Sequence, residues 1–325
     1  MTELIGHDLF GHDEAWRAWR AAMASDRMHH AWILTGLKGL GKGAFARAAA
    51  ADLVAEPGVP RPAGAMHPDI LIPEHPPENK DEVKKRDDGQ PYRRKRSIPI
   101  DEVRTIQRRL TTRPTLGNRR VVIIDPADDL EKAAANALLK SLEEPPVGTF
   151  FLLVTHRLGR LLPTLRSRCR VLRFAPLTAD QVGAVLRAQV PQADAATCAA
   201  AIAAAEGSPG SALDFVSQDL GKLHGLMQRL IAEGDDHFAL RGGFADELGA
   251  RPDRERQLAA VGLARAVVAE QLGRAGADRD NRVITAHGAL LRLGAQLPTY
   301  NFDPGLVAME IGALLASLAG PTEAA

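Results

Sequence analysis

Apolar runs without alternation recur along the first half of the chain, separated by stretches with helical spacing. Such uninterrupted runs are typical of strands buried on both faces of a parallel sheet. The predicted strands are 31–35, 70–72, 121–124 and 150–154. The predicted helices are 14–23, 43–53, 101–110 and 130–144, the last ended by consecutive prolines. The pattern predicts an α/β domain in which helices cover a parallel sheet.

The second half of the chain has a different pattern. After about residue 176, alanine and leucine recur at helical spacing, and runs typical of strands are absent. We therefore expect an α/β domain over 1–175, a small helical domain over 176–216 and an all-helical domain over 217–325. Within the first domain, residues 57–98 combine many prolines with mixed charges, which predicts a long, mobile surface insertion.

Composition indicates an ordinary globular protein. The chain has 325 residues, of which 45% are hydrophobic, and is long enough for two or three cores. The 41 Lys and Arg residues balance 40 Asp and Glu residues, so net charge indicates no partner. Two cysteines, Cys169 and Cys198, are too few for a disulfide framework. Because a signal-peptide pattern and an apolar run of ~20 residues are both missing from the sequence, we expect a cytoplasmic protein.

A glycine-rich segment follows the first predicted strand. Gly36, Gly39, Gly41 and Lys42 belong to a G-x-x-x-x-G-K motif that leads into a predicted helix. Glycines allow backbone N–H groups to point at phosphate oxygens, the helix N-terminus adds partial positive charge, and the lysine can reach the outer phosphates. A glycine turn without a ligand is the alternative, but the order of strand, turn and helix favours a phosphate loop.

Two positions around this loop are unsuited to hydrolysis. Gly43 stands where a Ser or Thr hydroxyl normally coordinates Mg²⁺. Asp125 follows the third strand and can hold a metal, but Pro126 takes the place of the glutamate that would orient the attacking water. Phosphoryl transfer depends mostly on positioning and electrostatics, so we expect no ATP hydrolysis by this chain. Asp128 and Asp129 are expected to cap the following helix rather than to replace the missing groups.

A Ser-Arg-Cys motif at 167–169 follows the fourth predicted strand. Together with the phosphate loop, this motif resembles the clamp-loader branch of the AAA+ ATPases. Other segments that are similar to its bacterial members are 29–32, 67–69, 136–146 and 301–304. The similarity is dense over 27–174 and thin elsewhere. It implies an α/β P-loop (AAA+) domain, followed by a lid domain at 176–216 and a collar domain at 217–325.

The resemblance implies roles for three further residues. In this family Arg168 would be an arginine finger that enters the ATP site of the adjacent subunit, where its guanidinium offsets charge that builds up at the γ-phosphate. A surface arginine in a loop before a strand is the alternative. Thr155 stands at the sensor-1 position, although a buried threonine that ends a strand is equally ordinary. Gly210 takes the place of the sensor-2 arginine.

The substitutions at Gly43, Pro126 and Gly210 favour the non-catalytic kind of clamp-loader subunit over the ATP-hydrolysing gamma/tau kind. The resemblance then implies gamma/tau and delta subunits as partners, an indirect or weak contact with the sliding clamp, and primed DNA bound as part of the complex. Arg104 and Thr105 are the DNA-contact candidates, because their helix faces DNA in this family. An active AAA+ P-loop ATPase or remodelling motor is the alternative.

No cofactor is expected to be required. Binding of ATP or ADP to the degenerate loop without hydrolysis stays open. Bacterial members of the family often carry a Cys-rich zinc module before the segment at 67–69, whereas residues 57–66 contain no cysteine. We therefore expect neither zinc nor another bound metal.

Overall fold

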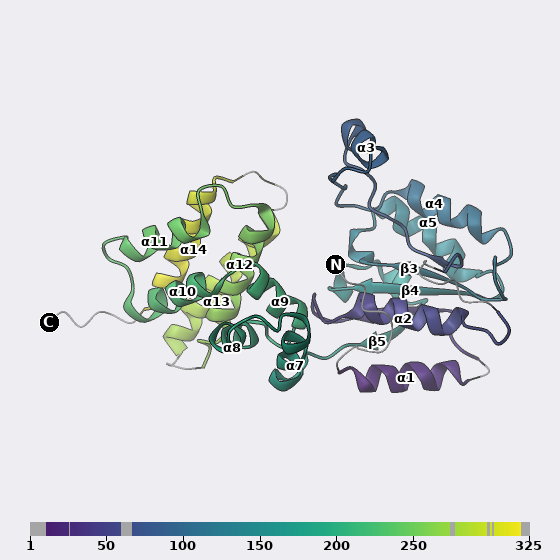
Figure 1. The fold of residues 1–325 in the computed structure, drawn as a ribbon, viewed down its shortest axis with the longest axis horizontal. Coiled ribbons are helices and arrows are strands. Elements are labelled where there is room, and N and C mark those ends of the chain that lie inside the picture. Colours follow the sequence, from purple (N-terminus) through teal and green to yellow (C-terminus); the bar gives the residue numbers. More distant parts are fainter. Residues whose placement is uncertain are drawn as a thin grey trace. The chain divides into compact units, whose positions relative to one another are not determined.

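The computed structural model describes residues 11–25, 27–59, 67–273, 277–297, 300 and 302–319. It divides into two compact units, Met1–Pro176 and Leu177–Ala325, whose elements are labelled in Figure 1. The boundary falls one residue beyond the predicted end of the α/β domain. The further division at 216 stays a prediction.

The first unit is built on a five-stranded sheet with the order β2-β3-β4-β1-β5. All neighbouring strands pair in parallel. Because parallel strands point the same way, their last residues lie along one edge, which we call the carboxyl edge, and their first residues lie along the opposite, amino edge. The strands are β1 Ala31–Thr35, β2 Ile70–Leu71, β3 Arg120–Ile124, β4 Thr149–Thr155 and β5 Arg170–Arg173.

The four predicted strands are confirmed, and β5 was missed. Every residue of β1 and β3 is buried, as the unbroken apolar runs predicted. In β5 only Leu172 is buried, and Val171 is 37% exposed. An edge strand has one solvent-facing side and tolerates charged side chains, so β5 does not carry the sequence pattern of a buried strand.

Helices cover both faces of this sheet (Figure 1). On one face Trp19, Trp32 and Phe45 belong to an apolar cluster that α1 and α2 share with the strands. On the other face Val103 and Leu138 belong to the cluster of α4 and α5. The helices of this unit are α1 Asp13–Met23, α2 Lys42–Val54, α3 Lys80–Asp87, α4 Ile100–Leu110, α5 Lys132–Glu143 and α6 Pro163–Arg166, with 3₁₀ turns η1 Ala127–Asp129 and η2 Leu158–Arg160.

The insertion at 57–98 has an internal framework that the sequence pattern did not predict. It contains helix α3, whose N-cap residue Asn79 accepts hydrogen bonds from the amides of the first turn. Glu82 is only 4% exposed and accepts a hydrogen bond from the Arg93 amide at 2.7 Å and from Lys85 Nζ at 2.8 Å. A buried carboxylate therefore ties α3 to the chain that returns towards the sheet. Residues 60–66 of the insertion lie outside the described residues.

The second unit is helical and has its own apolar core. No helix in the described part of the chain has the length and apolar character that crossing a membrane requires. The helices are α7 Ala179–Gln189, α8 Ala195–Ala204, α9 Pro209–Ser217, α10 Gly221–Glu233, α11 Ala239–Leu248, α12 Arg254–Ala269, α13 Ala277–Gln296 and α14 Pro304–Ala316.

Candidate functional site

The glycine-rich segment connects β1 to α2 at the carboxyl edge, as predicted. Gly39 and Gly41 both have φ of 81°, a left-handed conformation that glycine adopts readily. At Gly36 a Cβ atom would lie 2.6 Å from the Phe174 carbonyl oxygen, so the close approach of these two backbone segments requires glycine. The loop thus has the backbone geometry that depends on its glycines.

Lys42 begins α2 and is folded back into the loop. Its Nζ donates to the Gly36 carbonyl at 2.8 Å and to the Leu37 carbonyl at 2.5 Å, and the residue is only 2% exposed. Burial lowers the pKa of Lys42 to about 8, against the opposing effect of the Asp125 and Asp128 carboxylates. Its ammonium is therefore still largely protonated at neutral pH and is satisfied by the carbonyls of its own loop.

The position of the Mg²⁺-binding hydroxyl is filled by another group. A Cβ atom at Gly43 would lie 2.2 Å from Asp125 Oδ2 and 3.2 Å from a guanidinium nitrogen of Arg47. Arg47 Nη1 lies 3.8 Å from Asp125 Oδ2 and forms an ion pair with it. The residues present therefore do not fit the Mg²⁺ ion of hydrolysing P-loop proteins, because a hydroxyl ligand is missing and the nearest carboxylate is paired with an arginine.

Asp128 does not cap a helix, which corrects the prediction. Its Oδ1 accepts a hydrogen bond from Thr155 Oγ1 at 2.8 Å, and its Oδ2 accepts one from the His156 amide at 2.7 Å. Asp129 Oδ2 lies 3.1 Å from His75 Nε2. Among the described residues, neither η1 nor α5 receives a side-chain cap. Both carboxylates instead join segments distant in sequence, and Asp128 fixes the carboxyl end of β4.

Thr155 lies at the carboxyl edge beside this network and is fully buried. Its hydroxyl proton is committed to Asp128, and its oxygen accepts a hydrogen bond from the Arg157 amide at 3.1 Å. The residue thus has a structural function that accounts for its burial. Its sensor-1 role stays a prediction.

Arg168 lies at the amino edge of the sheet, between α6 and β5. Its Nη1 donates to the Thr164 carbonyl at 2.8 Å, and its guanidinium forms an ion pair with Glu143 at the end of α5. The Arg168 side chain remains 33% exposed. Trp32 of β1 is in register with Arg170 of β5, so Arg168 precedes the paired strands, whereas the phosphate loop follows them.

This register separates the arginine from its own phosphate loop. Four residue steps of paired strand, from Trp32 to Gly36, span roughly 13 Å at ~3.3 Å per residue, and Arg168 lies further back still. The guanidinium also points to Glu143 and not towards the carboxyl edge. Arg168 is therefore not a component of the loop on its own chain.

Helix α4 presents the two DNA-contact candidates on its exposed face. Val103 and Ile106 bury the opposite face in the core. The Arg104 side chain is 61% exposed and its Nη1 lies 3.3 Å from Asp101 Oδ1. Thr105 is exposed as well, but its hydroxyl donates to the Asp101 carbonyl at 2.9 Å. Arg104 is thus available to a partner, whereas the Thr105 hydroxyl both donates to the Asp101 carbonyl and accepts a hydrogen bond from Arg108 Nη2 at 2.9 Å within its own helix.

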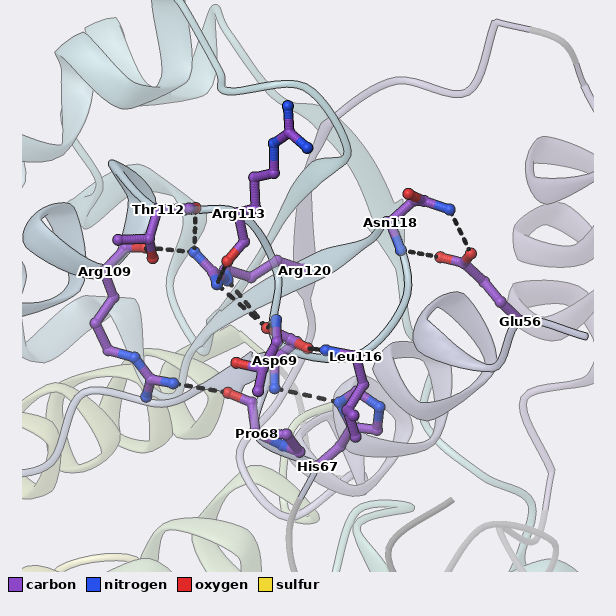
Figure 2. Close-up of polar contacts among 11 residues, drawn as sticks. Glu56, His67, Pro68, Asp69, Arg109, Thr112, Arg113, Leu116, Asn118 and Arg120 are labelled. Atoms are coloured by element: carbon purple, nitrogen blue, oxygen red, sulfur yellow. Dashed lines mark hydrogen bonds and ion pairs between the residues drawn. The ribbon is translucent and has the colours of Figure 1, made fainter. Parts of the chain in front are cut away.

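The segment at 67–69 has a structural role that the sequence did not reveal (Figure 2). Asp69 is 0% exposed and its carboxylate accepts hydrogen bonds from the Thr115 and Leu116 amides, each at 2.7 Å. Arg120 Nη2 lies 3.2 Å from Asp69 Oδ1. Burial raises the pKa of Asp69, but the two amides and the Arg120 guanidinium outweigh it and hold the pKa below its usual value.

Arg120 carries this network further along the connection between α4 and β3. Its Nη2 donates to the Arg113 carbonyl at 2.8 Å, and its Nη1 donates to the Thr112 carbonyl at 3.1 Å and to the Arg109 carbonyl. Figure 2 shows these carbonyls converging on the guanidinium. A buried ion pair therefore fixes the end of α4. The one sequence signal for it is an arginine at the start of an otherwise apolar strand.

The remaining predicted positions belong to other elements. Gly210 is the second residue of α9, in the second unit. Burial raises the pKa of the Cys169 thiol to about 12, so this cysteine is unreactive at neutral pH. No group of three or more His, Cys, Asp or Glu residues is placed to hold a metal ion in the part of the chain that the structure describes. Most of the segment predicted to lack zinc, residues 60–66, lies outside that part.

Known proteins resemble this chain in sequence and in fold. It is 34% identical over 212 residues to DNA polymerase III subunit delta' of Escherichia coli (61% of this chain, 58% of that protein) and 36% identical over 155 residues to the subunit delta' of Pseudomonas aeruginosa (43% and 41%). The alignments thus span about half the length of these relatives. A DNA polymerase III gamma subunit-related protein from Thermotoga maritima shares the fold, with a TM-score of 0.52 and 20% identity over 94% of this chain and 99% of that one.

The family comparison covers the whole α/β unit. A family model described as DNA polymerase III, delta subunit matches residues 11–178, which include the phosphate loop, Asp125 and Arg168. The sheet order and the solved structure above agree with the predicted fold, an α/β domain followed by a helical part. With more than half of its length matched by this model, the chain belongs to the DNA polymerase III delta-subunit family.

Proposed function

We propose that this chain is a non-catalytic, delta-prime type subunit of the replicative clamp loader. In this role it helps to load the sliding clamp onto primed DNA and supplies Arg168 to the ATP site of a neighbouring gamma/tau subunit. The observation that carries the proposal is the placement of Arg168 before β5, at the edge of the sheet opposite to its own phosphate loop. An arginine so placed is out of reach of its own phosphate loop, which supports a role at a nucleotide held by another subunit.

The contacts of Arg168 would allow its guanidinium to exchange Glu143 for a neighbour's phosphate. Its ion pair with Glu143 joins side chains that are 33% and 48% exposed, and pairs of this kind contribute only ~0–1 kcal/mol. A triphosphate carries more negative charge than one carboxylate and accepts bidentate hydrogen bonds from a guanidinium. A neighbour's γ-phosphate would therefore displace Glu143 at little cost. The guanidinium would then offset the charge of the transition state.

The phosphate loop of this chain supports the non-catalytic half of the proposal. Gly43 offers no hydroxyl, Pro126 offers no carboxylate to orient water, and Asp125 is paired with Arg47. Gly210 in the second unit removes the arginine expected there in active relatives. We therefore expect no intrinsic ATPase activity, and no zinc or other metal.

The remaining surfaces are assigned to partners by the same proposal. Residues 176–216 would form the lid and 217–325 the collar that joins the gamma/tau and delta subunits, with only indirect or weak contact to the clamp. Arg104 would approach the phosphates of primed DNA from the exposed face of α4, and Thr105 would contact them once its hydroxyl donates to a phosphate in place of the Asp101 carbonyl. The complex would work in the cytoplasm, where the chromosome is replicated.

ATP turnover measured in a reconstituted complex tests this function. The isolated chain should hydrolyse no ATP, and the complex of gamma/tau, delta and wild-type chain should hydrolyse it upon addition of clamp and primed DNA. Arg168→Ala should slow the one ATP site that it completes by ~10³-fold or more, whereas Arg166→Ala, a change two residues earlier at the end of α6, should leave turnover intact. Turnover by the isolated chain would instead support the alternative, an active P-loop ATPase.

A further inference from the structure

A charged pair occupies the place of the metal beside the phosphate loop. Arg47 lies one turn beyond Gly43 on α2, so the two positions share a face of the helix. Its Nη1 lies 3.8 Å from Asp125 Oδ2 and would lie 3.2 Å from a Cβ atom at Gly43. The Arg47 side chain is 57% exposed, which leaves it room to turn towards a ligand over the loop.

Glycine at position 43 makes this pair possible. A Cβ atom there would lie 2.2 Å from Asp125 Oδ2, a separation that would force the carboxylate away from the helix. Glycine at position 43 therefore has two effects at once: it removes the hydroxyl that would bind Mg²⁺, and it lets Asp125 approach the helix. Asp125, the carboxylate that would hold the metal in a hydrolysing protein, therefore lies against α2 and forms an ion pair with Arg47, which is permanently charged.

We propose that the phosphate loop binds the phosphates of a nucleotide without a divalent cation, and that the Arg47 guanidinium supplies the positive charge that Mg²⁺ supplies elsewhere. A guanidinium is always charged and offers several N–H donors in a plane that matches phosphate oxygens. Mg²⁺ demands near-octahedral oxygen ligands, but beside this loop Asp125 is paired with Arg47, and both carboxylate oxygens of Asp128 already accept hydrogen bonds. A dication would also be repelled by the guanidinium.

A second group at the carboxyl edge, the His156 ring, has a nitrogen that could bind a ligand. His156 follows β4, and its Nδ1 is buried without a hydrogen-bond partner among the described residues. Burial and the nearby Lys42 ammonium lower the pKa of His156, so its ring is neutral at pH 7. An unpaired buried nitrogen is costly, and a bound molecule or water that reaches the loop would satisfy it.

The inference extends the proposed function and does not depend on Arg168. A nucleotide that binds without Mg²⁺ would not be hydrolysed, because the cation that bridges the β- and γ-phosphates is missing. It would instead act as a structural ligand that holds the carboxyl edge of this subunit. The loop would then have kept its phosphate geometry at Gly39 and Gly41 while losing catalysis.

Calorimetric titration of the full-length chain with ADP, in EDTA and in Mg²⁺, tests the proposal. The wild-type chain should bind ADP in both buffers with dissociation constants that agree within about twofold, and pyrophosphate should compete with ADP. Arg47→Gln should weaken binding in EDTA by about tenfold or more and make binding tighter in Mg²⁺ than in EDTA, because Asp125 is released. Arg47→Lys, which keeps the charge, should bind in EDTA with intermediate affinity.

Arg229→Gln is the matched control, since Arg229 is also an exposed arginine paired with a carboxylate, on α10 of the second unit. This variant should bind ADP like the wild type. Circular dichroism should show that the Arg47 variants are folded. The proposal is overturned if the wild type binds no ADP in EDTA, if binding requires Mg²⁺, or if Arg47→Gln binds as tightly as the control. None of these outcomes bears on the effect of Arg168→Ala in the complex, so the two proposals fail separately.

Discussion

The two edges of the sheet use their charged side chains in opposite ways. At the carboxyl edge Lys42 is 2% exposed and donates to the carbonyls of its own loop, and Asp125 is paired with Arg47. At the amino edge the Arg168 side chain is 33% exposed and is held by the Thr164 carbonyl and by a surface ion pair with Glu143. Under the two proposals above, the charges at the carboxyl edge hold a ligand of this chain, whereas the Arg168 guanidinium acts on the nucleotide of another subunit.

The largest expected effect concerns stability and compares the Asp69–Arg120 ion pair with the Asp125–Arg47 ion pair, both in the α/β unit. Asp69→Ala should reduce the free energy of unfolding by about 3–5 kcal/mol, because it leaves the Arg120 guanidinium buried without its partner. Asp125→Ala should cost at most about 1 kcal/mol, because its partner Arg47 is 57% exposed. Urea unfolding followed by tryptophan fluorescence isolates this unit, which holds all three tryptophans. Equal losses for the two variants would contradict the assignment.

The same carboxylate predicts a pH dependence. The folded-state pKa of Asp69 is held below its ordinary value of 3.8, so the stabilisation from its ionised form is complete above that value. It is lost as the pH falls through the lower, folded-state pKa. The free energy of unfolding of the wild type should therefore fall more steeply below about pH 4 than that of Asp69→Asn. Parallel curves for the two proteins would show that Asp69 is not the group responsible.

A smaller effect concerns the carboxyl edge alone, where the protonation of Lys42 should control the affinity for ADP. Its pKa of about 8 means that the ammonium loses its proton as the pH rises through that value. ADP binding to the loop should weaken by about tenfold between roughly pH 7 and 9.5, since a charge-assisted hydrogen bond to phosphate is lost. Lys42→Met should bind weakly with little pH dependence. A wild-type affinity that stays constant over this range would place Lys42 away from the phosphates.

The smallest expected effect tests the exposed face of α4. Arg104→Ala should reduce the slope of log affinity against log salt for primed DNA by about 0.9, the value for one phosphate contact, in the complete complex. Lys222→Ala removes a 74% exposed cation from the second unit and should not change the slope. Identical slopes for Arg104→Ala and wild type would remove Arg104 from the DNA contacts.

The sequence predicted the buried strands and the phosphate loop because both depend on local pattern. Apolar runs mark β1 and β3, and the order of strand, glycine turn and helix places Lys42. It did not predict β5, which lies at an edge and exposes charged residues. Nor did it predict the Asp128 contacts with Thr155 and His156. These residues are 27 and 28 positions away along the chain, and neither the helical nor the strand period relates positions so far apart.

The pairing of Asp69 with Arg120 was missed for the same reason. The two residues are 51 positions apart and become neighbours only when β2 and β3 pair. The Arg47 contact with Asp125 likewise depends on α2 packing beside the end of β3. Local sequence thus predicts which groups are present at an edge of the sheet. The tertiary structure decides which of them are already paired.

The central claim is that this chain contributes to ATP hydrolysis through Arg168 at its amino edge, and not through the phosphate loop at its carboxyl edge. A single experiment compares Arg168→Ala and Lys42→Ala, each assembled with gamma/tau, delta, clamp and primed DNA, by the ATP turnover of the complex. The account predicts that Arg168→Ala abolishes turnover at the neighbouring site that it completes, a loss of ~10³-fold or more there, and that Lys42→Ala leaves turnover at every hydrolysing site unchanged. Unchanged turnover with Arg168→Ala, or a loss of hydrolysis at this chain's own loop with Lys42→Ala, would contradict it.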